Sequence, residues 1–502
     1  MIEGRHGRVN ATLRPPLPAS GVRRGLTRTR LEMAPCLSVH SRLIIRIGCR
    51  DRVKPSSTLI FFATLLCFGA HDVNAQELTA EKVAGAPSER RALAFPDDPA
   101  IGYLAGPAED AVADWNRRLD TGESRLTFDA ETGYLRSVLD TLKLSTKSQL
   151  LVYSKTSVQA SRINPANPRA LYFSDNLVVG YIRDAPFLEF AVLDKKKGVQ
   201  FYTLEQRASA TPRAKKGGDC LRCHESLKSM DVPGMLLRSL PTGPDGTIFP
   251  QLGNYTTDHR SPIEQRWGGW YVTGNLGRAE HMGNLLLRNP LQADMKIASS
   301  ETLTSADKRF DQRGYLTPFS DVVALMVFEH QMHMINLLVR IGWDARFALS
   351  QPADATNRQL TQTLLVNNAR ELVDYLLFIN EAPLPSAITG SVFAAEFSSR
   401  GPFDRKGRSL RQLDLSQRLL RYPCSYMIYS EAFDALPAEA RVSIYDRLWA
   451  ILSGEEKDAA YGKLSADDRR AIIEILRDTK PDLAGRRDFR EFSASTRHRP
   501  SD

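Results

Sequence analysis

Between residues 149 and 204, short apolar runs alternate with turn signals. The runs are rich in β-branched and aromatic residues, and Asn, Asp, Pro and Gly separate them, which is typical of strands. Because the intervals are short, we expect neighbouring strands to pair antiparallel. The predicted strands are Gln149–Ser154, Ala170–Phe173, Leu177–Ile182, Phe187–Leu193 and Val199–Leu204, with further candidates at Met235–Leu240 and Gly269–Thr273. The first of these two candidates leads into a strong turn signal, Pro244-Asp245-Gly246.

Helical periodicity appears before this region and again after about residue 318. Apolar positions recur every three or four residues in these segments, as on the buried face of a helix. The predicted helices are Glu109–Leu119, about Gly133–Leu142, Ser320–Ile341, Leu360–Ile379, Ser416–Tyr429, Val442–Leu452 and Asp467–Leu476. Capping residues precede four of the later ones, namely Ser320, Thr356, Ser416 and Ser465. The sequence therefore predicts an α+β fold, with an antiparallel β-containing region followed by a mainly α-helical C-terminal region.

Composition divides the chain into five segments. A leader covers residues 1–75, and an extended lead-in follows over 76–105. We expect a mixed α/β domain over 106–315, a helical domain over 316–485 and a disordered, charged and Ser-rich tail over 486–502.

The leader accounts for the net charge of +9. Residues 1–57 hold twelve Lys and Arg against three acids, whereas residues 76–502 hold 55 basic and 54 acidic side chains. The part after the leader is therefore near neutral, and we expect no nucleic-acid partner.

The leader also has the features of a signal peptide. An apolar run of thirteen residues, 58–70, follows a basic segment and precedes Val73-Asn74-Ala75, where small residues favour cleavage after Ala75. The run is shorter than the roughly 20 residues of a membrane span. No later segment approaches eighteen consecutive apolar residues, so we expect no membrane span after cleavage. The alternative is an uncleaved anchor. We expect the mature protein to be periplasmic or secreted, in a bacterium.

Cleavage leaves three cysteines, Cys220, Cys223 and Cys424, which are too few for a disulfide scaffold. Two of them lie in Cys220-Leu-Arg-Cys223-His224, a complete C-x-x-C-H, the spacing that attaches haem c. Two thiols on one helical turn can each form a thioether with a haem vinyl group, and His224 then becomes the proximal iron ligand. Because the chain has one such motif, we expect one covalently bound haem c.

Two other chemistries use similar spacing. A zinc site needs four ligands, usually from a second C-x-x-C or a paired-His cluster, and because the mature chain has only Cys424 beyond the motif, a site of four cysteines is impossible. A redox-active dithiol needs the motif at a strand-to-helix junction of a βαβ unit, which the following sequence does not supply. Export favours haem c over both, because bacteria attach this haem outside the cytoplasm.

The sixth iron ligand has several candidates. The histidines are His259, His281, His330 and His333, and the methionines are Met230, Met235, Met282, Met326, Met332 and Met334. His330 and His333 draw most attention, because they share one face of a predicted helix and adjoin Glu329. Either is a candidate distal ligand, or the three residues form a second metal site. The alternative is a polar patch at a helix interface.

A second unusual stretch, Arg266–Gly274, carries two Trp around two Gly. It is interpreted either as a wall of a haem pocket or as a tightly packed β-turn. Arg238, Arg260 and Arg266 are candidate partners for haem propionates.

With these motifs, the sequence resembles a family of large exported bacterial proteins that carry one cytochrome c signature and have no assigned activity. The resemblance covers roughly residues 100–480. It rests on Ala170–Asp175, the Cys220–His224 motif with Val232-Pro-Gly234 after it, Arg266–Gly274, Val322–Gln331 and Arg421–Tyr429. It implies haem c and export.

Two functions follow from a single haem c. The first, which we favour, is an exported c-type cytochrome that transfers electrons to or from a periplasmic redox partner protein. The second is a haem-dependent oxidoreductase, peroxidase- or oxygenase-like, with an open distal site near His330 and His333. In a third interpretation the haem is structural, in a sensor or scaffold. The iron's second axial position distinguishes the first two.

Overall fold

The computed structural model describes residues 92–288, 301–486, 488 and 489. An antiparallel sheet of six strands lies in the N-terminal half of the chain. Its strands follow one another in space as they do in sequence, in the order β1-β2-β3-β4-β5-β6, and every neighbouring pair is antiparallel. The strands are β1 (Leu150–Val152), β2 (Arg169–Phe173), β3 (Leu177–Tyr181), β4 (Phe187–Asp194), β5 (Gly198–Glu205) and β6 (Lys215–Lys216). A separate pair consists of β7 (Arg238–Ser239) and β8 (Tyr255–Thr256).

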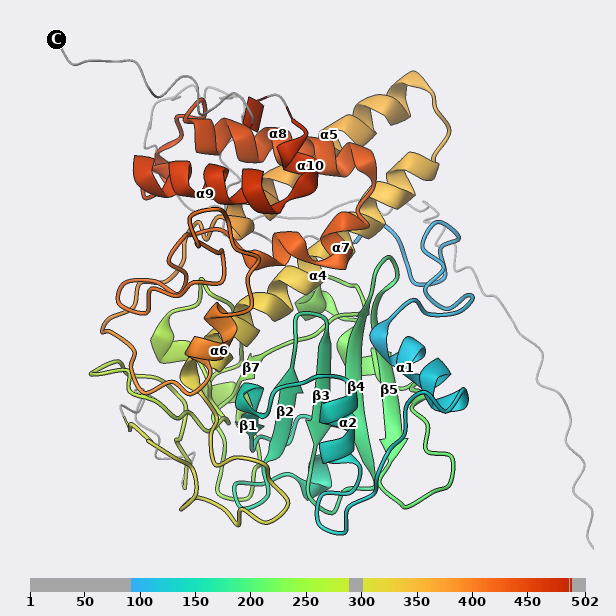
Figure 1. Cartoon of the computed structure of the whole chain (residues 1–502), viewed down its shortest axis with the longest axis vertical. Coiled ribbons are helices and arrows are strands. Elements are labelled where there is room, and N and C mark those ends of the chain that lie inside the picture. Colours follow the sequence, from blue (N-terminus) through green and yellow to red (C-terminus); the bar gives the residue numbers. More distant parts are fainter. Residues whose placement is uncertain (1–91, 289–300, 487, 490–502) are drawn as a thin grey trace, which may run out of the picture. The chain divides into compact units, whose positions relative to one another are not determined.

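Helices dominate the second half (Figure 1). The helices are α1 (Ala111–Asp120), α2 (Leu135–Thr141), α3 (Leu221–His224), α4 (Val322–Ser350), α5 (Ala355–Leu376), α6 (Ala394–Ser398), α7 (Glu431–Asp434), α8 (Ala438–Ser453), α9 (Ala466–Thr479) and α10 (Pro481–Ala484). The predicted α+β fold, an antiparallel sheet followed by a mainly helical region, is confirmed.

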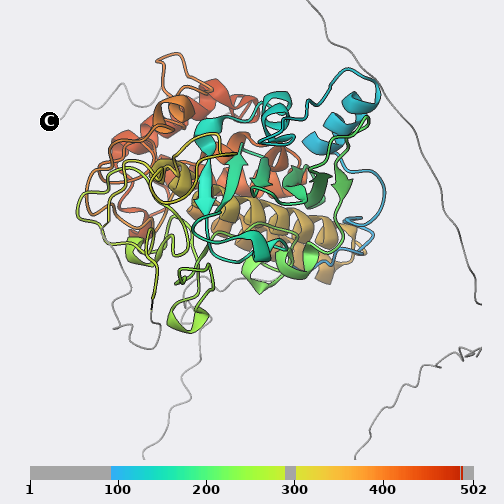
Figure 2. The ribbon, with the colours of Figure 1, turned by 90° about the horizontal axis from the view of Figure 1, so that it is seen from below.

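The alternating strands cover two separate cores. One face, with Tyr172, Val179 and Phe190, packs against α1 and α2. The opposite face, with Leu171 and Phe201, packs against α4, and Figure 2 shows α4 and the pair α1 and α2 on opposite sides of the sheet. Successive side chains of a strand point to opposite faces, so one strand serves both cores.

Helix α4 is the central element of the larger core. Twenty-nine residues long, it is buried on nearly all sides, and its buried residues include polar ones such as Glu329, His330 and Asn336. It is long and apolar enough to cross a membrane, with a mean hydropathy of 1.4, but 94% of that apolar window is buried inside the protein. Asp321 caps its start by accepting hydrogen bonds from Val323 and Ala324.

The larger core continues from the sheet through α4 into α5, α8 and α9. The described residues from 92 onward belong to one unit, and the larger core contains residues from both sides of positions 315 and 316, where we placed a domain boundary. In the lead-in, Ile101 and Tyr103 are buried in this core. Phe489, from the predicted tail, is also buried and packs against Trp449. The leader and the rest of the tail lie outside the described residues.

Two predicted elements are wrong. Ser416–Tyr429 forms no α-helix, and only a 3₁₀ turn, Tyr426–Tyr429, is helical there. Gly269–Thr273 makes isolated bridges, such as Val152 with Trp270, but forms no strand. Among the predicted caps, Ser465 caps α9, whereas Asp321 and Asp354 take the places expected for Ser320 and Thr356.

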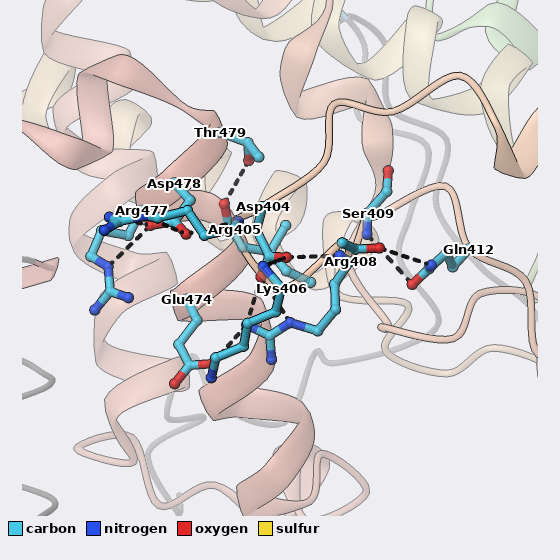
Figure 3. Close-up of polar contacts among 12 residues, drawn as sticks. Asp404, Arg405, Lys406, Arg408, Ser409, Gln412, Glu474, Arg477, Asp478 and Thr479 are labelled. Atoms are coloured by element: carbon cyan, nitrogen blue, oxygen red, sulfur yellow. Dashed lines mark hydrogen bonds and ion pairs between the residues drawn. The ribbon is translucent and has the colours of Figure 1, made fainter.

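Hydrogen bonds and ion pairs connect the loop 404–412 to α9 (Figure 3). The buried Asp404 carboxylate accepts hydrogen bonds from Arg408 Nε at 2.8 Å and from the backbone amides of Lys406 and Arg408. Arg408 also bonds Glu474 of α9 at 2.7 Å, and Lys406 reaches the same carboxylate at 2.8 Å.

Replacing Arg408→Ala is expected to lower the free energy of unfolding by about 2 kcal/mol, because the buried Asp404 carboxylate loses its charged partner. Urea unfolding followed by circular dichroism measures this loss. Lys406→Ala is the control, because its side chain is 64% exposed and its ion pair is worth at most about 1 kcal/mol. Equal losses in the two variants would contradict the role of Asp404 burial.

Candidate functional site

The C-x-x-C-H motif forms one short helix. Cys220 is the N-cap residue of α3, and Cys223 and His224 are its last two residues. Backbone bonds from Cys223 and His224 to the Cys220 carbonyl close the turn, at 3.2 and 3.0 Å. Neither cysteine is in a disulfide; Cys220 is half-buried and Cys223 is exposed. The two thiols therefore have the helical spacing that attachment to a haem requires.

Glycine keeps space free beside the first thiol. A Cβ added at Gly217 would lie 3.0 Å from Cys220 Sγ, which is tighter than about nine in ten real Cβ contacts. Burial raises the pKa of the Cys220 thiol. Reactive dithiol cysteines show the opposite, a lowered pKa.

His224 has a fixed orientation. Its Nδ1 lies 2.9 Å from the carbonyl oxygen of Gly234, and since a carbonyl only accepts, Nδ1 carries the proton. The other nitrogen, Nε2, is then a free acceptor, and the structure gives it no partner among the described residues. The ring packs on Phe201 of β5, with centroids 4.6 Å apart. A histidine that ligates a metal typically has this arrangement, with its second nitrogen bonded to a carbonyl.

The sheet beside His224 carries a charged cluster. Arg169 of β2 and Glu189 of β4 pair at 3.3 Å and act electrostatically on His224. Glu189 also accepts hydrogen bonds from Ser157 and Gln159. The cluster was not evident from the sequence, because its members come from separate loops and strands.

The residues fit a covalently attached haem c. Two unpaired thiols lie on one turn, and the proximal imidazole offers Nε2. Cys220, Cys223 and His224 would hold the group.

His330 has partners at both ring nitrogens. Its Nδ1 lies 2.8 Å from His259 Nδ1, and its Nε2 lies 2.7 Å from Ser425 Oγ. Tyr375 and Phe378 stack on the ring. Burial lowers the pKa of His330 to about 3, so the ring is neutral at pH 7. It would have to break a hydrogen bond to ligate iron.

His333 is similarly engaged. Its Nε2 lies 3.2 Å from Arg260 Nη2, and its Nδ1 faces the Asp258 carboxylate at 3.5 Å. Glu329, the third residue of the suggested second metal site, instead pairs with Arg266 at 3.1 Å and accepts from Thr257 at 2.7 Å. Within the described part of the chain no group of three or more His, Cys, Asp or Glu side chains is arranged to hold a metal, so that site is not formed.

Four of the ten candidate sixth ligands line one cavity of about 190 Å³. They are Met230, Met235, Met332 and His333. This cavity is smaller than the 300–1,000 Å³ typical of pockets for drug-sized ligands, and haem is at least as large as such a ligand. Of the other candidates, Met326 and Met334 are buried in the core, and Met282 accepts a contact from Ser239 at 3.6 Å.

The Trp-Gly-Gly-Trp stretch is a tight β-turn, closed by a hydrogen bond from Trp270 N to Trp267 O at 3.0 Å. Both indoles are buried, and Trp270 donates to the Arg238 carbonyl. Of the three candidate propionate partners, Arg260 and Arg266 are committed to buried or partly buried carboxylates, while Arg238 lies within electrostatic reach of Cys223.

His281 packs against Trp267 and makes stability depend on pH. Burial lowers its pKa to about 4, and its Nδ1 accepts from Gly283 N at 3.0 Å. Between about pH 6.5 and 4 the unfolded chain binds this proton and the folded chain does not, so the contribution of His281 is lost as pH falls.

We expect His281→Gln to be less stable than the native protein at pH 7, and the difference to shrink by up to about 1.4 kcal/mol per pH unit below pH 6.5. Urea unfolding at pH 7, 6, 5 and 4.5 measures both proteins. A difference that stays constant with pH would show that His281 is protonated in the fold.

Comparison with known proteins gives no match: no family model, no curated protein and no solved structure is similar to this chain at a significant level.

Proposed function

We propose that the mature chain is an exported c-type cytochrome that carries one haem c and transfers electrons to or from a periplasmic redox partner. The observation that carries this proposal is the hydrogen bond from His224 Nδ1 to the Gly234 carbonyl. It leaves Nε2 unprotonated next to two unpaired thiols on the same helical turn.

The chain's own residues have separate tasks in this function. Cys220 and Cys223 hold the group covalently, and Phe201 restricts rotation of the His224 ring. When bound, haem c supplies reversible one-electron exchange between ferric and ferrous iron. Because Cys223 is exposed, a group attached there has an edge near the surface, where a partner protein can approach.

Electron transfer is favoured over oxidoreductase chemistry. The oxidoreductase alternative placed an open distal site near His330 and His333, and because both histidines have protein partners at their nitrogens, neither is free to act on a small molecule there. Export and cleavage after Ala75 remain part of the proposal on sequence grounds.

Optical spectra test this proposal. We expect the full chain, expressed with its leader in a bacterium that attaches haem c, to give the pyridine-haemochrome spectrum of haem c at one haem per chain. We also expect low-spin ferric and ferrous spectra that carbon monoxide leaves unchanged. The chain without residues 1–75, kept in the cytoplasm, is the control and should contain no covalent haem.

Two results would contradict the proposal in different ways. Absence of the haem c spectrum would remove the cytochrome assignment itself. A ferrous spectrum that shifts with carbon monoxide would keep haem c and replace electron transfer with small-molecule chemistry at an open iron position.

A further inference from the structure

The Gly234 carbonyl that orients His224 belongs to a peptide unit held from its other side. The amide N–H of that unit, on Met235, donates to Asn336 Oδ1 at 2.9 Å. Asn336 Nδ2 in turn donates to the Met235 carbonyl at 2.8 Å. Asn336 lies in the middle of α4, is 2% exposed, and is 101 residues from Met235 in sequence.

These contacts form a chain of hydrogen bonds through one peptide plane. His224 Nδ1–H donates to the Gly234 carbonyl, and the same plane donates through Met235 N–H to Asn336. Consecutive hydrogen bonds polarise one another, so the last acceptor strengthens the first bond. The plane cannot turn without breaking a bond at each end.

Other contacts keep the peptide plane near both partners. Gly234 N donates to the His224 carbonyl at 2.9 Å, and Val199 N of β5 donates to the Pro233 carbonyl at 3.1 Å. A Cβ at Gly234 would lie 2.3 Å from Asn336 Oδ1, so glycine is what allows the amide to approach. The segment 233–235 is therefore hydrogen-bonded to the motif, to the sheet and to α4.

We propose that Asn336 is a positioning residue for the haem iron: it holds the 234–235 peptide so that His224 keeps its proton on Nδ1 and presents Nε2 as a strong donor to the metal. This inference rests on the proposed haem c function. A stronger Nδ1–H bond makes the imidazole a more basic ligand, which stabilises ferric iron and lowers the reduction potential.

Three full-length variants test the role of Asn336. Asn336→Leu removes both hydrogen bonds at similar volume, and Asn336→Asp keeps an acceptor for Met235 N–H. Asn368→Leu is the matched control, because Asn368 is also a buried asparagine of the helical region, but it bonds Arg340 and Asp344.

The first measurement is the midpoint potential of the haem-loaded proteins. We expect Asn336→Leu to raise the ferrous-to-ferric ratio at fixed ambient potential by up to about tenfold, which is about 59 mV for one electron. Asn336→Asp should lie at or below the native potential, and Asn368→Leu should match the native protein even where urea unfolding shows it destabilised. Equal potentials in Asn336→Leu and the native protein would overturn the inference.

The second measurement needs no haem. In full-length protein with both motif cysteines replaced by serine, ¹⁵N chemical shifts of the His224 ring report which nitrogen is protonated. We expect Nδ1 alone with Asn336 present and a mixture of tautomers in Asn336→Leu. If the native chain lacks haem c, the cytochrome assignment fails while this result still decides the role of Asn336; an unchanged tautomer in Asn336→Leu would overturn that role.

Discussion

The double variant Cys220→Ser and Cys223→Ser is expected to lose all covalently bound haem and yet to fold. Haem c is held by two thioether bonds, and the mature chain has no other C-x-x-C pair. Neither thiol is part of a disulfide, and Cys223 is exposed, so serine at both positions removes little packing. Haem content is measured by haem staining on denaturing gels and by the pyridine-haemochrome spectrum after extraction with acidified acetone.

Each single variant should keep one thioether. The vinyl group left unreacted stays conjugated with the haem ring, so the α band of the pyridine haemochrome moves to longer wavelength. The single variants therefore distinguish attachment at Cys220 from attachment at Cys223, which a simple loss of haem cannot.

The third cysteine provides the control for this prediction. Cys424 is buried, and burial raises the pKa of its thiol to about 12. Cys424→Ala should leave the haem content at one per chain, although it removes a buried side chain. Haem that resists extraction from the double serine variant would contradict attachment through the motif.

The sheet was predictable from the sequence because its strands alternate and its turns are marked. All five predicted strands between residues 149 and 204 form, with bounds that differ by at most two residues. The order is simple, since neighbouring strands are consecutive in sequence, and short loops join β2 to β3, β3 to β4 and β4 to β5. The sixth strand, Lys215–Lys216, has no apolar residue and pairs only at the edge, so periodicity could not identify it.

The predicted helix Ser416–Tyr429 failed because its apolar pattern reflects burial and not helical geometry. Pro423 disfavours helical backbone at the residue before it, and Leu415 adopts a positive φ of 61°. Tyr426, Met427 and Ile428 are nevertheless buried in the core. A run of apolar residues in a tightly packed loop resembles one face of a helix.

The motif itself was predictable, but most of its surroundings were not. Three residues around the motif come from distant elements: Phe201 of β5 packs on His224, Arg169 of β2 acts on it electrostatically, and Asn336 of α4 bonds the peptide that orients it. Their local sequence does not indicate these roles. Gly234 was the exception, because it belongs to the Val-Pro-Gly segment singled out after the motif. Conversely, His330 and His333 looked like ligands because sequence spacing cannot show that their nitrogens have partners.

Replacing Gly246→Ala is expected to lower the free energy of unfolding by about 3–4 kcal/mol. Gly246 has a φ of +88°, which costs an alanine about 1–2 kcal/mol. The added Cβ would also lie 2.8 Å from the Tyr153 carbonyl and 2.9 Å from the Ile163 carbonyl. Overpacking of this kind typically costs about 1–3 kcal/mol. Urea unfolding followed by circular dichroism measures the sum.

Gly122→Ala and Gly407→Ala separate the two contributions. Both glycines have similar φ values, +76° and +73°, but nothing lies within 4 Å of an added Cβ. Their losses should be about 1 kcal/mol, because only backbone strain remains, and a stiffer unfolded chain offsets part of it. The difference in unfolding free energy between Gly246→Ala and these controls therefore measures only the cost of displacing the neighbouring backbone.

That difference should be large because the neighbours of Gly246 cannot move independently. Tyr153 N donates to the Gly269 carbonyl, and Lys155 N donates to the Gly246 carbonyl, so the turn is bonded to the end of β1. A flexible side chain could turn away from a new methyl group, but two backbone carbonyl oxygens cannot move without shifting the chain that carries them. If Gly246→Ala lost no more than the controls, this turn would have to be free to shift. The turn was evident from Pro244-Asp245-Gly246, whereas the need for glycine at its third position comes from carbonyls more than eighty residues earlier in the chain.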